Sequence, residues 1–296
     1  METLIEQFRK DLEIRKCSKD TIEQYPQILR RFGEFVGGDL LAVDKKKLIA
    51  YADHLKNLSI DSRRRYFSAI GSFYEFAIEA ELIQTSPITP GFKKRYLHAY
   101  KDNRQSRKSL TTDEARKLID AIFTTRERAP IVLLLKTGIR LGELISLDLD
   151  DLDLPNLRIR LKPTAKRSNL TVFIDDETAR LLRKWLAKRE TMAKSTALFL
   201  NAHGDRYSRD SFELMFTKYS TVAGLHDASS KRLEDRCTPH TCRHFFTTEM
   251  RDRGMQREYV KKLRGDAVTE AIDIYNHISA EKLKKAYLDC VPQFGL

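Results

Sequence analysis

The sequence predicts a mainly α-helical protein with two domains, of which the second also carries a small antiparallel β-sheet. Apolar residues recur at helical spacing along most of the chain, whereas only residues 157–161 and 171–174 alternate like paired strands. Prolines and a glycine between residues 87 and 91 separate two helical regions. With 296 residues and 41% hydrophobic content, the chain is long and apolar enough to form two cores.

Residues 1–90 are expected to form an all-α domain, because apolar side chains recur at helical intervals up to about residue 80. Ser18 is the expected cap of a helix that Gly37 ends, and Pro26 is expected to shift or bend it. A further helix is predicted at residues 62–81, and its first turn is strongly basic.

Residues 91–108 are basic and polar and show no period of a helix or a strand. We interpret them as a linker, because lysines and arginines between two folded units can reach phosphates on either side. For the basic first turn of the helix predicted at residues 62–81, the alternative to DNA binding is an ordinary solvent-exposed helix face. The candidate DNA-binding residues are Arg63, Arg64, Arg65, Lys93, Lys94 and Arg95.

Residues 109–296 are expected to form the second domain. It opens with the spacing of a capping box, Thr111 and Glu114. The stretch IVLLLKTG is apolar on several faces, which predicts a buried helix that Gly138 ends. Helices are also expected at residues 176–190, at about 208–223 and from Thr238 to Gly254.

Arg140 directly follows the predicted buried helix, in TGIRLGEL. Its backbone is therefore expected to be held firmly while its guanidinium faces a cleft, and Glu143, one turn away, can orient it. In the predicted hairpin, the connection KPTAKRSN is an exposed basic turn from which Lys166 would project.

The stretch from Thr238 to His277 carries the clearest chemistry. His240 and Arg243 lie at the start of a predicted helix, where backbone donors and the positive end of the helix dipole favour an anion. Tyr275 follows in IDIYNH. A histidine and an arginine that polarise a phosphate, with a tyrosine hydroxyl that attacks it, would form a covalent phosphotyrosine centre if further cations join them.

The formal net charge of +12 comes from lysines and arginines interspersed with acids, which indicates a folded protein with an acidic partner. Double-stranded DNA is the first candidate, and a basic protein without such a partner is the alternative. No apolar run approaches the roughly 20 residues that span a bilayer, and METLIEQFRK lacks a signal-peptide core. The four cysteines show no paired spacing, so we expect a cytoplasmic protein without membrane attachment.

Arg140, Lys166, His240, Arg243 and Tyr275 occur in this order, and with them the chain resembles the tyrosine recombinase or phage-integrase family, including the Xer-type recombinases. TGIRLGEL is similar to the family's first arginine motif, HTCRH to its H-x-x-R motif and IYNH to its nucleophile motif. The helices up to about residue 88 resemble the family's core-binding domain.

The resemblance implies that the Tyr275 hydroxyl cleaves a DNA strand to give a 3′-phosphotyrosine link and a free 5′-hydroxyl, followed by religation to a new partner. It implies neither a cofactor nor a metal, and it implies four protomers on two DNA sites, with the segment after Tyr275 docked on a neighbour. A lysine near the leaving oxygen would protonate it. Integration, excision and resolution of dimeric replicons all stay open.

Two positions depart from the family pattern. Asp266, in LRGD, stands where many members carry a histidine. An ionised carboxylate cannot donate a hydrogen bond to a phosphate, so we expect Asp266 to cap the stretch DAVTEAIDIY or, alternatively, to hold Arg264 or Arg243. The hairpin lacks the common glycine-rich form, so Lys166 is chosen by its distance to the second strand, and Lys162 remains the alternative.

Two rival functions fit parts of the sequence. A metal site, as in a metal-dependent nuclease, is suggested by the cluster of Cys237, His240, Cys242 and His244, but Arg243 lies among them and no second ligand pair follows at finger spacing. A sequence-specific DNA-binding protein without catalysis is the other rival. The complete set of arginines, lysine, histidine and tyrosine argues against it, whereas Asp266 leaves room for it.

Overall fold

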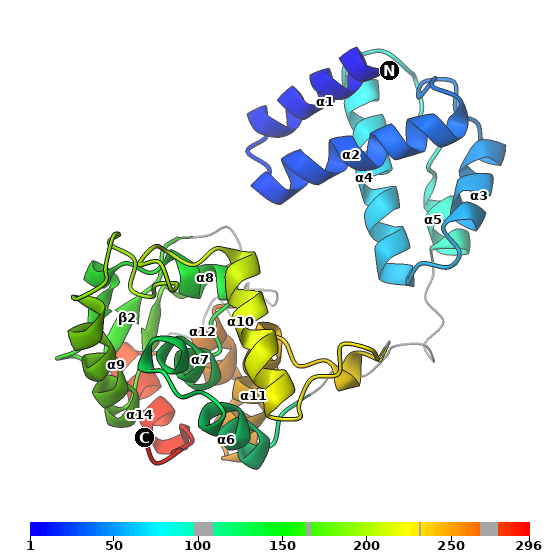
Figure 1. Ribbon diagram of the computed structural model, residues 1–296. Helices are drawn as coiled ribbons and strands as arrows, with labels where there is room; N and C mark the ends of the chain where they lie inside the picture. Colours follow the sequence, from blue (N-terminus) through cyan, green and yellow to red (C-terminus); the bar gives the residue numbers. More distant parts are fainter. Residues whose placement is uncertain (98–108, 164–166, 231, 267–277) are drawn as a thin grey trace. The chain divides into compact units, whose positions relative to one another are not determined.

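The computed structural model shows two compact units, residues 1–104 and residues 105–296. It describes residues 1–97, 109–163, 167–230, 232–266 and 278–296. The chain is mainly helical, with a single three-stranded antiparallel sheet among the described residues, as the sequence predicted (Figure 1). None of the described helices is long and apolar enough to cross a bilayer.

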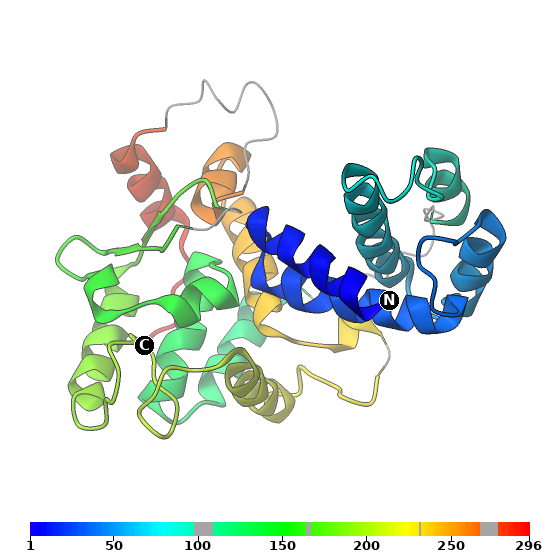
Figure 2. The same cartoon turned by 90° about the horizontal axis from the view of Figure 1, so that it is seen from above.

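The first unit is built entirely of helices in its described part, and α1 and α2 lie side by side (Figure 2). As the sequence predicted, the Ser18 side chain accepts from the Thr21 backbone N–H, and the second helix ends at Gly37 in the left-handed region. That helix continues through Pro26. The helices of the first unit are α1 (Glu2–Ile14), α2 (Lys19–Val36), α3 (Lys45–His54), α4 (Ile60–Glu79) and α5 (Pro90–Tyr96).

The segment expected to begin the linker is partly helical. Thr89 caps α5 by accepting from the Phe92 backbone N–H at 3.1 Å, and both Phe92 and Leu97 are buried in the core of the first unit. The prediction of an irregular connector from residue 91 was therefore wrong up to residue 97, because two buried apolar side chains anchor a short helix that also carries three basic residues. Residues 98–108, the rest of the expected linker, lie outside the described residues.

The second unit packs helices around the small sheet. The bounds of its elements are α6 (Thr112–Asp120), α7 (Thr125–Thr137), α8 (Leu141–Ser146), η2 (Leu149–Asp151), β1 (Leu152–Asp153), β2 (Arg158–Arg160), β3 (Thr171–Phe173), α9 (Asp176–Arg189), α10 (Arg209–Val222), η3 (Leu233–Asp235), α11 (Pro239–Asp252), α12 (Arg257–Arg264) and α14 (Ala280–Cys290).

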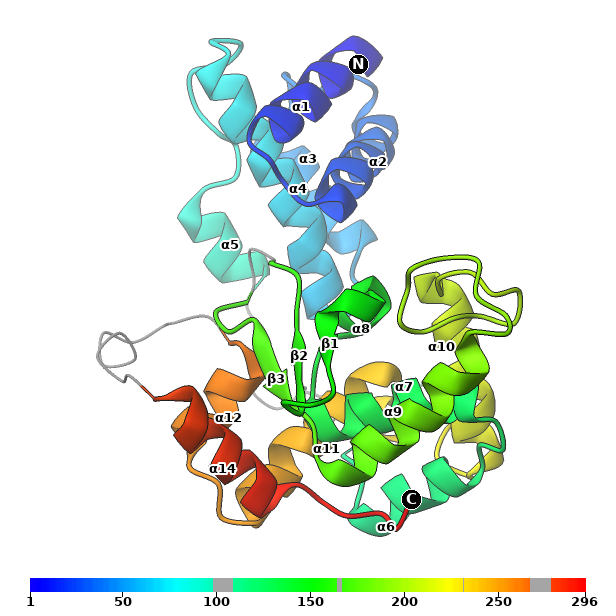
Figure 3. The same cartoon turned by 90° about the vertical axis from the view of Figure 1, so that its left-hand side faces the viewer.

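The sheet has the order β1-β2-β3, with Ile159 paired to Val172 between the two predicted strands. The short strand β1 was not predicted from the sequence. Figure 3 shows α12 beside the β3 edge, and the Asn169 side-chain amide, just before β3, donates to the Lys262 carbonyl on α12 at 3.1 Å.

Helix α7 lies at the centre of the unit and packs on α9 and α11. Its apolar run, residues 131–135, is fully buried, as predicted. The helix ends at Gly138, whose φ of +61° is left-handed, and a Cβ there would lie 2.4 Å from the Phe246 ring on α11. This close approach brings the middle of α11 against the end of α7, where Arg140 follows.

Candidate active site

Arg140 is held at the start of α8 by Glu143. The Arg140 backbone N–H donates to Glu143 Oε2 at 2.7 Å, and Arg140 Nη1 donates to Oε1 at 3.0 Å. The Glu143 side chain is 5% exposed, whereas that of Arg140 is 34% exposed. The guanidinium is therefore fixed at one end and accessible at the other, as the sequence indicated.

Arg243 is the fifth residue of α11, and only 4% of its side chain is exposed. Its Nη1 donates to the Gly138 carbonyl at 2.6 Å, and its Nη2 donates to the Arg264 carbonyl at 3.1 Å. Burial, with the nearby charges of Arg140 and Arg264, lowers the pKa of Arg243 to about 10. It still carries a positive charge at neutral pH.

The Asp266 carboxylate joins these arginines. Its Oδ1 accepts from Arg243 Nη2 at 2.8 Å and lies 3.9 Å from Arg140 Nη2, while its Oδ2 lies 3.4 Å from Arg264 Nε. The contact with Arg243 and Arg264 is the alternative role considered for this residue. The preferred role, a cap of the following helix, involves residues 267–277, which lie outside the described residues.

Arg167 is a further buried cation at this site, and the sequence patterns did not single it out. Its Nη1 donates to Glu143 Oε2 at 3.0 Å, so Glu143 contacts Arg140 and Arg167 together. Burial lowers the pKa of the Arg167 guanidinium, and the Glu143 charge opposes this shift. From the sequence, an arginine in a basic turn such as Arg167 is expected to be exposed to solvent. Its buried hydrogen-bond acceptors are distant in sequence, so no local pattern predicts them.

His240 is exposed at the start of α11, one turn before His244, and the two rings pack edge to face with centroids 4.7 Å apart. Cys237 and Cys242 are buried, and burial raises the pKa of the Cys242 thiol well above its ordinary value. Within the described ranges, no group of three His, Cys, Asp or Glu side chains is arranged to hold a metal ion. Cys237, just before α11, and Cys242, within it, are thus core residues of the second unit.

Two models of protein families match the chain. The family model described as "Phage integrase family" matches residues 108–282, and "Phage integrase, N-terminal SAM-like domain" matches residues 4–84. The chain belongs to the phage integrase family. It is a tyrosine-type site-specific recombinase, an enzyme that cleaves and rejoins DNA strands.

Relatives of this integrase-family chain match along nearly its whole length. Tyrosine recombinase XerC of Herpetosiphon aurantiacus is 31% identical, with 96% of this chain and 94% of the relative covered. Tyrosine recombinase XerD of Staphylococcus epidermidis is 25% identical, with coverage of 99% and 100%.

Solved structures share the fold. A lambda integrase dimer bound to a COC′ core site aligns with a TM-score of 0.72 at 16% identity, covering 95% of this chain and 99% of that one. The XerH recombinase bound to difH substrate, a pre-cleavage complex, aligns with a TM-score of 0.65 at 21% identity, covering 97% and 84%.

The expected nucleophile and lysine of this integrase-family site, Tyr275 and Lys166, lie outside the described residues. The alternative lysine, Lys162, forms an ion pair with Asp148, which also pairs with Arg206. Tyr287 is the nearest other tyrosine in the sequence, but it is 1% exposed in an apolar cluster, and burial raises the pKa of its hydroxyl well above the ordinary value. Tyr287 is therefore unsuited to attack DNA.

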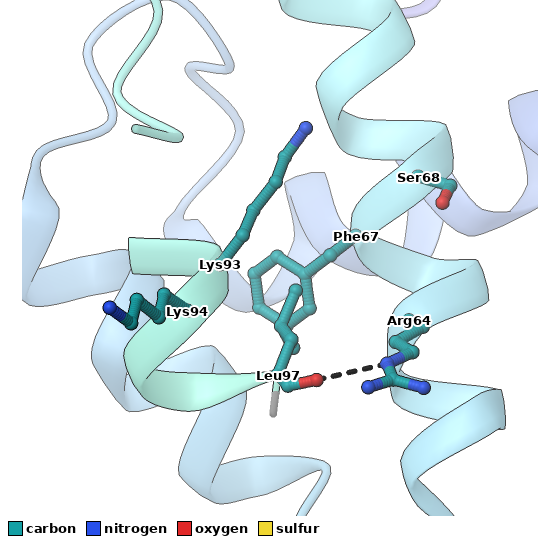
Figure 4. A pocket seen from close by; sticks show the side chains of 6 residues that line it. All are labelled: Arg64, Phe67, Ser68, Lys93, Lys94 and Leu97. Carbon is teal, nitrogen blue, oxygen red and sulfur yellow. Dashed lines mark hydrogen bonds between the residues drawn. The ribbon is translucent and has the colours of Figure 1, made fainter. Parts of the chain in front are cut away.

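Some of the candidate DNA-binding residues of the first unit gather around a hollow between α4 and α5. Arg64 Nε donates to the Leu97 carbonyl at 2.9 Å, and Lys93 and Lys94 extend from α5 on the other side (Figure 4). The hollow has a volume of about 400 Å³ and includes Phe67 and Ser68 in its lining. Arg65 and Arg95 are exposed and Arg63 is half-buried, and none of these three lines it.

Proposed function

We propose that this recombinase cleaves DNA with Tyr275 as the nucleophile and with Arg140, Arg243 and His240 binding the scissile phosphate. The convergence of Arg140 and Arg243 on one anionic oxygen, Asp266 Oδ1, is the observation that carries this assignment. Guanidinium forks at this spacing can donate to the nonbridging oxygens of one phosphate. His240, exposed one turn before His244 at the same helix start, adds a third donor beside the positive end of the helix dipole.

The reaction needs both charge neutralisation and proton transfer. A tyrosine hydroxyl with an unperturbed pKa of about 10 is a poor nucleophile at pH 7, so its attack depends on cations that stabilise the added negative charge on the phosphate. The bond from phosphorus to the Tyr275 oxygen forms while the bond to the 5′-oxygen breaks, and the proton of the Tyr275 hydroxyl passes to water. Lys166 supplies the proton that the 5′-oxygen takes up, and the reverse steps rejoin the strand to a new 5′-hydroxyl.

Lys166 is preferred to Lys162 on one structural ground. Lys162 is already engaged by Asp148, whose pKa is held well below its usual range, first by the hydrogen bond from Lys162. A lysine that donates to a carboxylate would have to give up that ion pair to reach a leaving oxygen.

Duplex DNA is the proposed partner of both units. The first unit, which includes α5, and the second unit each carry basic side chains, and together they would contact opposite faces of the duplex in the cytoplasm. Recombination would use four copies of the chain on two sites. The lambda integrase structure, a dimer on a core site, supports multimeric binding only as far as two copies.

A suicide substrate tests the assignment of the nucleophile. A nick near the cleavage site makes the fragment with the free 5′-hydroxyl short enough to diffuse away. Religation is then prevented, and the covalent protein–DNA adduct accumulates. Wild-type protein should form the adduct, and Tyr275→Phe should bind the same DNA with nearly unchanged affinity but form none. An adduct with Tyr275→Phe would refute the role of Tyr275.

A further inference from the structure

Arg167 makes an unusually complete set of buried contacts. Its side-chain nitrogens are fully buried, and Nη1 donates to Glu143 Oε2 and to the Arg264 carbonyl, both at 3.0 Å. Its Nη2 donates to the Leu263 carbonyl at 2.9 Å, and its Nε donates to the Asn169 carbonyl. A single guanidinium therefore joins α8, the hairpin before β3 and the last turn of α12.

Two of these acceptors are shared with the proposed phosphate-binding arginines. Glu143, which accepts from Arg167, also accepts from the backbone and side chain of Arg140. The Arg264 carbonyl, which accepts from Arg167, also accepts from Arg243 Nη2 at 3.1 Å. Arg167 thus contacts a supporting group of each arginine.

The next residue attaches the hairpin to the same turn. Ser168 donates from its backbone N–H to the Gly265 carbonyl at 3.2 Å and from its hydroxyl to the Asp266 carbonyl at 2.7 Å. Gly265 adopts a φ of +64°, and a Cβ at this position would lie 2.5 Å from Arg167 Cγ. The turn that carries Asp266 is therefore shaped around the Arg167 side chain.

We propose that Arg167 is a positioning residue for strand cleavage, which fixes Arg140 through Glu143 and fixes Arg243 through the Arg264 carbonyl. This inference rests on the proposed phosphate-binding role of Arg140 and Arg243. A planar guanidinium reaches a carboxylate and three carbonyls at once, whereas a lysine offers one nitrogen. Since small misplacements of catalytic groups are costly, Arg167→Lys should preserve the fold better than cleavage.

The test compares Arg167→Lys with Arg160→Gln, which changes an exposed arginine on β2 of the same hairpin. On an ordinary suicide substrate, single-turnover cleavage by Arg167→Lys should fall by about 10²-fold at saturating protein, while DNA affinity stays near that of the wild type. Arg160→Gln should cleave at the wild-type rate. Equal losses in both variants, or wild-type cleavage by Arg167→Lys, would refute the proposal.

A second substrate separates positioning from general destabilisation. A methylphosphonate at the cleavage position replaces one charged nonbridging oxygen by a methyl group, so the arginines have less charge to neutralise. The relative loss caused by Arg167→Lys should then shrink to about tenfold or less. An undiminished loss on this substrate would mean that Arg167 acts only on the general fold.

Arg140→Ala, measured on both substrates, distinguishes failure of this inference from failure of the proposed function. If Arg140→Ala gains nothing from the methylphosphonate, the phosphate-binding role itself fails. If Arg140→Ala gains and Arg167→Lys does not, only the positioning role fails. If Arg167→Lys does not fold, Glu143→Gln takes its place, because Glu143 links Arg167 to Arg140. Its relative loss of cleavage should likewise be smaller on the methylphosphonate substrate than on ordinary DNA.

Discussion

Arg243 Nη2 lies 2.8 Å from Asp266 Oδ1, so this buried arginine of the site is paired with a carboxylate of its own chain. Arg140 Nη2 lies 3.9 Å from the same oxygen. The carboxylate thus takes part of the space in which the two guanidinium groups converge. A scissile phosphate that binds both arginines has to replace the carboxylate or bind beside it.

The first prediction concerns the charge of Asp266. Asp266→Asn retains a carbonyl oxygen that accepts from Arg243 but removes the negative charge. Cleavage by Asp266→Asn should stay within roughly tenfold of wild type, because the loss of one supporting group costs less than the loss of an oxyanion donor, about 10²-fold. Single-turnover cleavage at saturating protein measures this.

Asp266→Ala is the companion variant, and it should lower the melting temperature more than it lowers cleavage, because the buried Arg243 then loses its charged partner. Collapse of cleavage in a well-folded Asp266→Asn protein would show that the carboxylate itself acts in the chemistry.

The second prediction distinguishes the two lysines. Lys166→Ala should lose cleavage of ordinary DNA and recover it when sulfur replaces the bridging 5′-oxygen, because a thiolate leaves without a proton. Lys162→Ala is the matched control, and it should cleave both substrates alike, since Lys162 is paired with Asp148. Sulfur rescue of Lys162→Ala, and not of Lys166→Ala, would reverse the assignment.

The local sequence was enough to predict elements whose signals are local. The capping box of Thr111 and Glu114 is present with both hydrogen bonds, and Gly138 ends α7 in the left-handed conformation. Arg140 and Glu143 are one turn apart, so their contact follows from the helix period. Each of these features depends on residues close in sequence, and the family motifs added the order of the site residues.

Contacts between distant segments were not predictable in the same way. The buried Arg167 bonds to Leu263 and Arg264, which approach it only after α12 packs beside the hairpin. Strand β1 has two residues, too few to show an alternating pattern. Helix α5 is stabilised by Phe92 and Leu97 in the core. Because basic residues separate these two side chains, the local sequence shows no apolar pattern that would predict a helix.

The third prediction concerns metal dependence. Cleavage should persist in excess EDTA, because the proposed chemistry uses guanidinium, imidazole and ammonium groups where a nuclease would use a divalent cation. The measurement is adduct formation on the suicide substrate with and without chelator. Loss of activity that only Mg²⁺ or Zn²⁺ restores would favour the metal-dependent alternative.

The fourth prediction concerns the hollow between α4 and α5. If Lys93 and Lys94 each bind a phosphate, changing both to Gln should lower the slope of log affinity against log salt by about two, because each lysine that no longer neutralises a phosphate releases about one counterion fewer. Lys19→Gln is the control, since Lys19 is exposed and lies 3.8 Å from Glu23. An unchanged slope in the double variant would place the DNA surface of this unit elsewhere.

The proposal that both units bind one duplex can be tested by measuring DNA affinity for the intact chain and for each unit alone. The intact chain should bind DNA more tightly than either separate unit, because binding of the second unit becomes intramolecular once the first is bound. Separate units that each match the intact chain would contradict a clamp.

The last prediction concerns the buried ion cluster that holds the C-terminal segment. Lys136 is fully buried and pairs with Asp175 at 2.6 Å and with Glu177. Glu177 also accepts from the backbone N–H groups of Phe294 and Leu296. The segment after α14 is thus fastened to its own second unit through the same carboxylates that neutralise Lys136.

Lys136→Met should lower the free energy of unfolding by about 3–5 kcal/mol, because it leaves two buried carboxylates without their cation. Burial alone would raise the pKa of Asp175 and Glu177. Lys136, together with hydrogen bonds from Thr178 and Gln293 to Asp175 and from the C-terminal backbone to Glu177, outweighs burial and lowers both pKa values. The wild-type ion pairs therefore contribute fully above the unfolded carboxylate pKa, and this contribution is lost as the pH falls through the lower folded values.

In Lys136→Met the cation is absent and burial dominates, so the folded pKa values should lie above the unfolded ones. The deficit relative to wild type should then be largest at neutral pH and shrink as the pH falls through the raised values, because protonation removes the unpaired charges. Urea unfolding of both proteins between about pH 7 and pH 4 measures the difference, with Lys184→Met as an exposed-lysine control on α9. A deficit that is constant with pH would mean that the cluster stabilises by packing and not by charge.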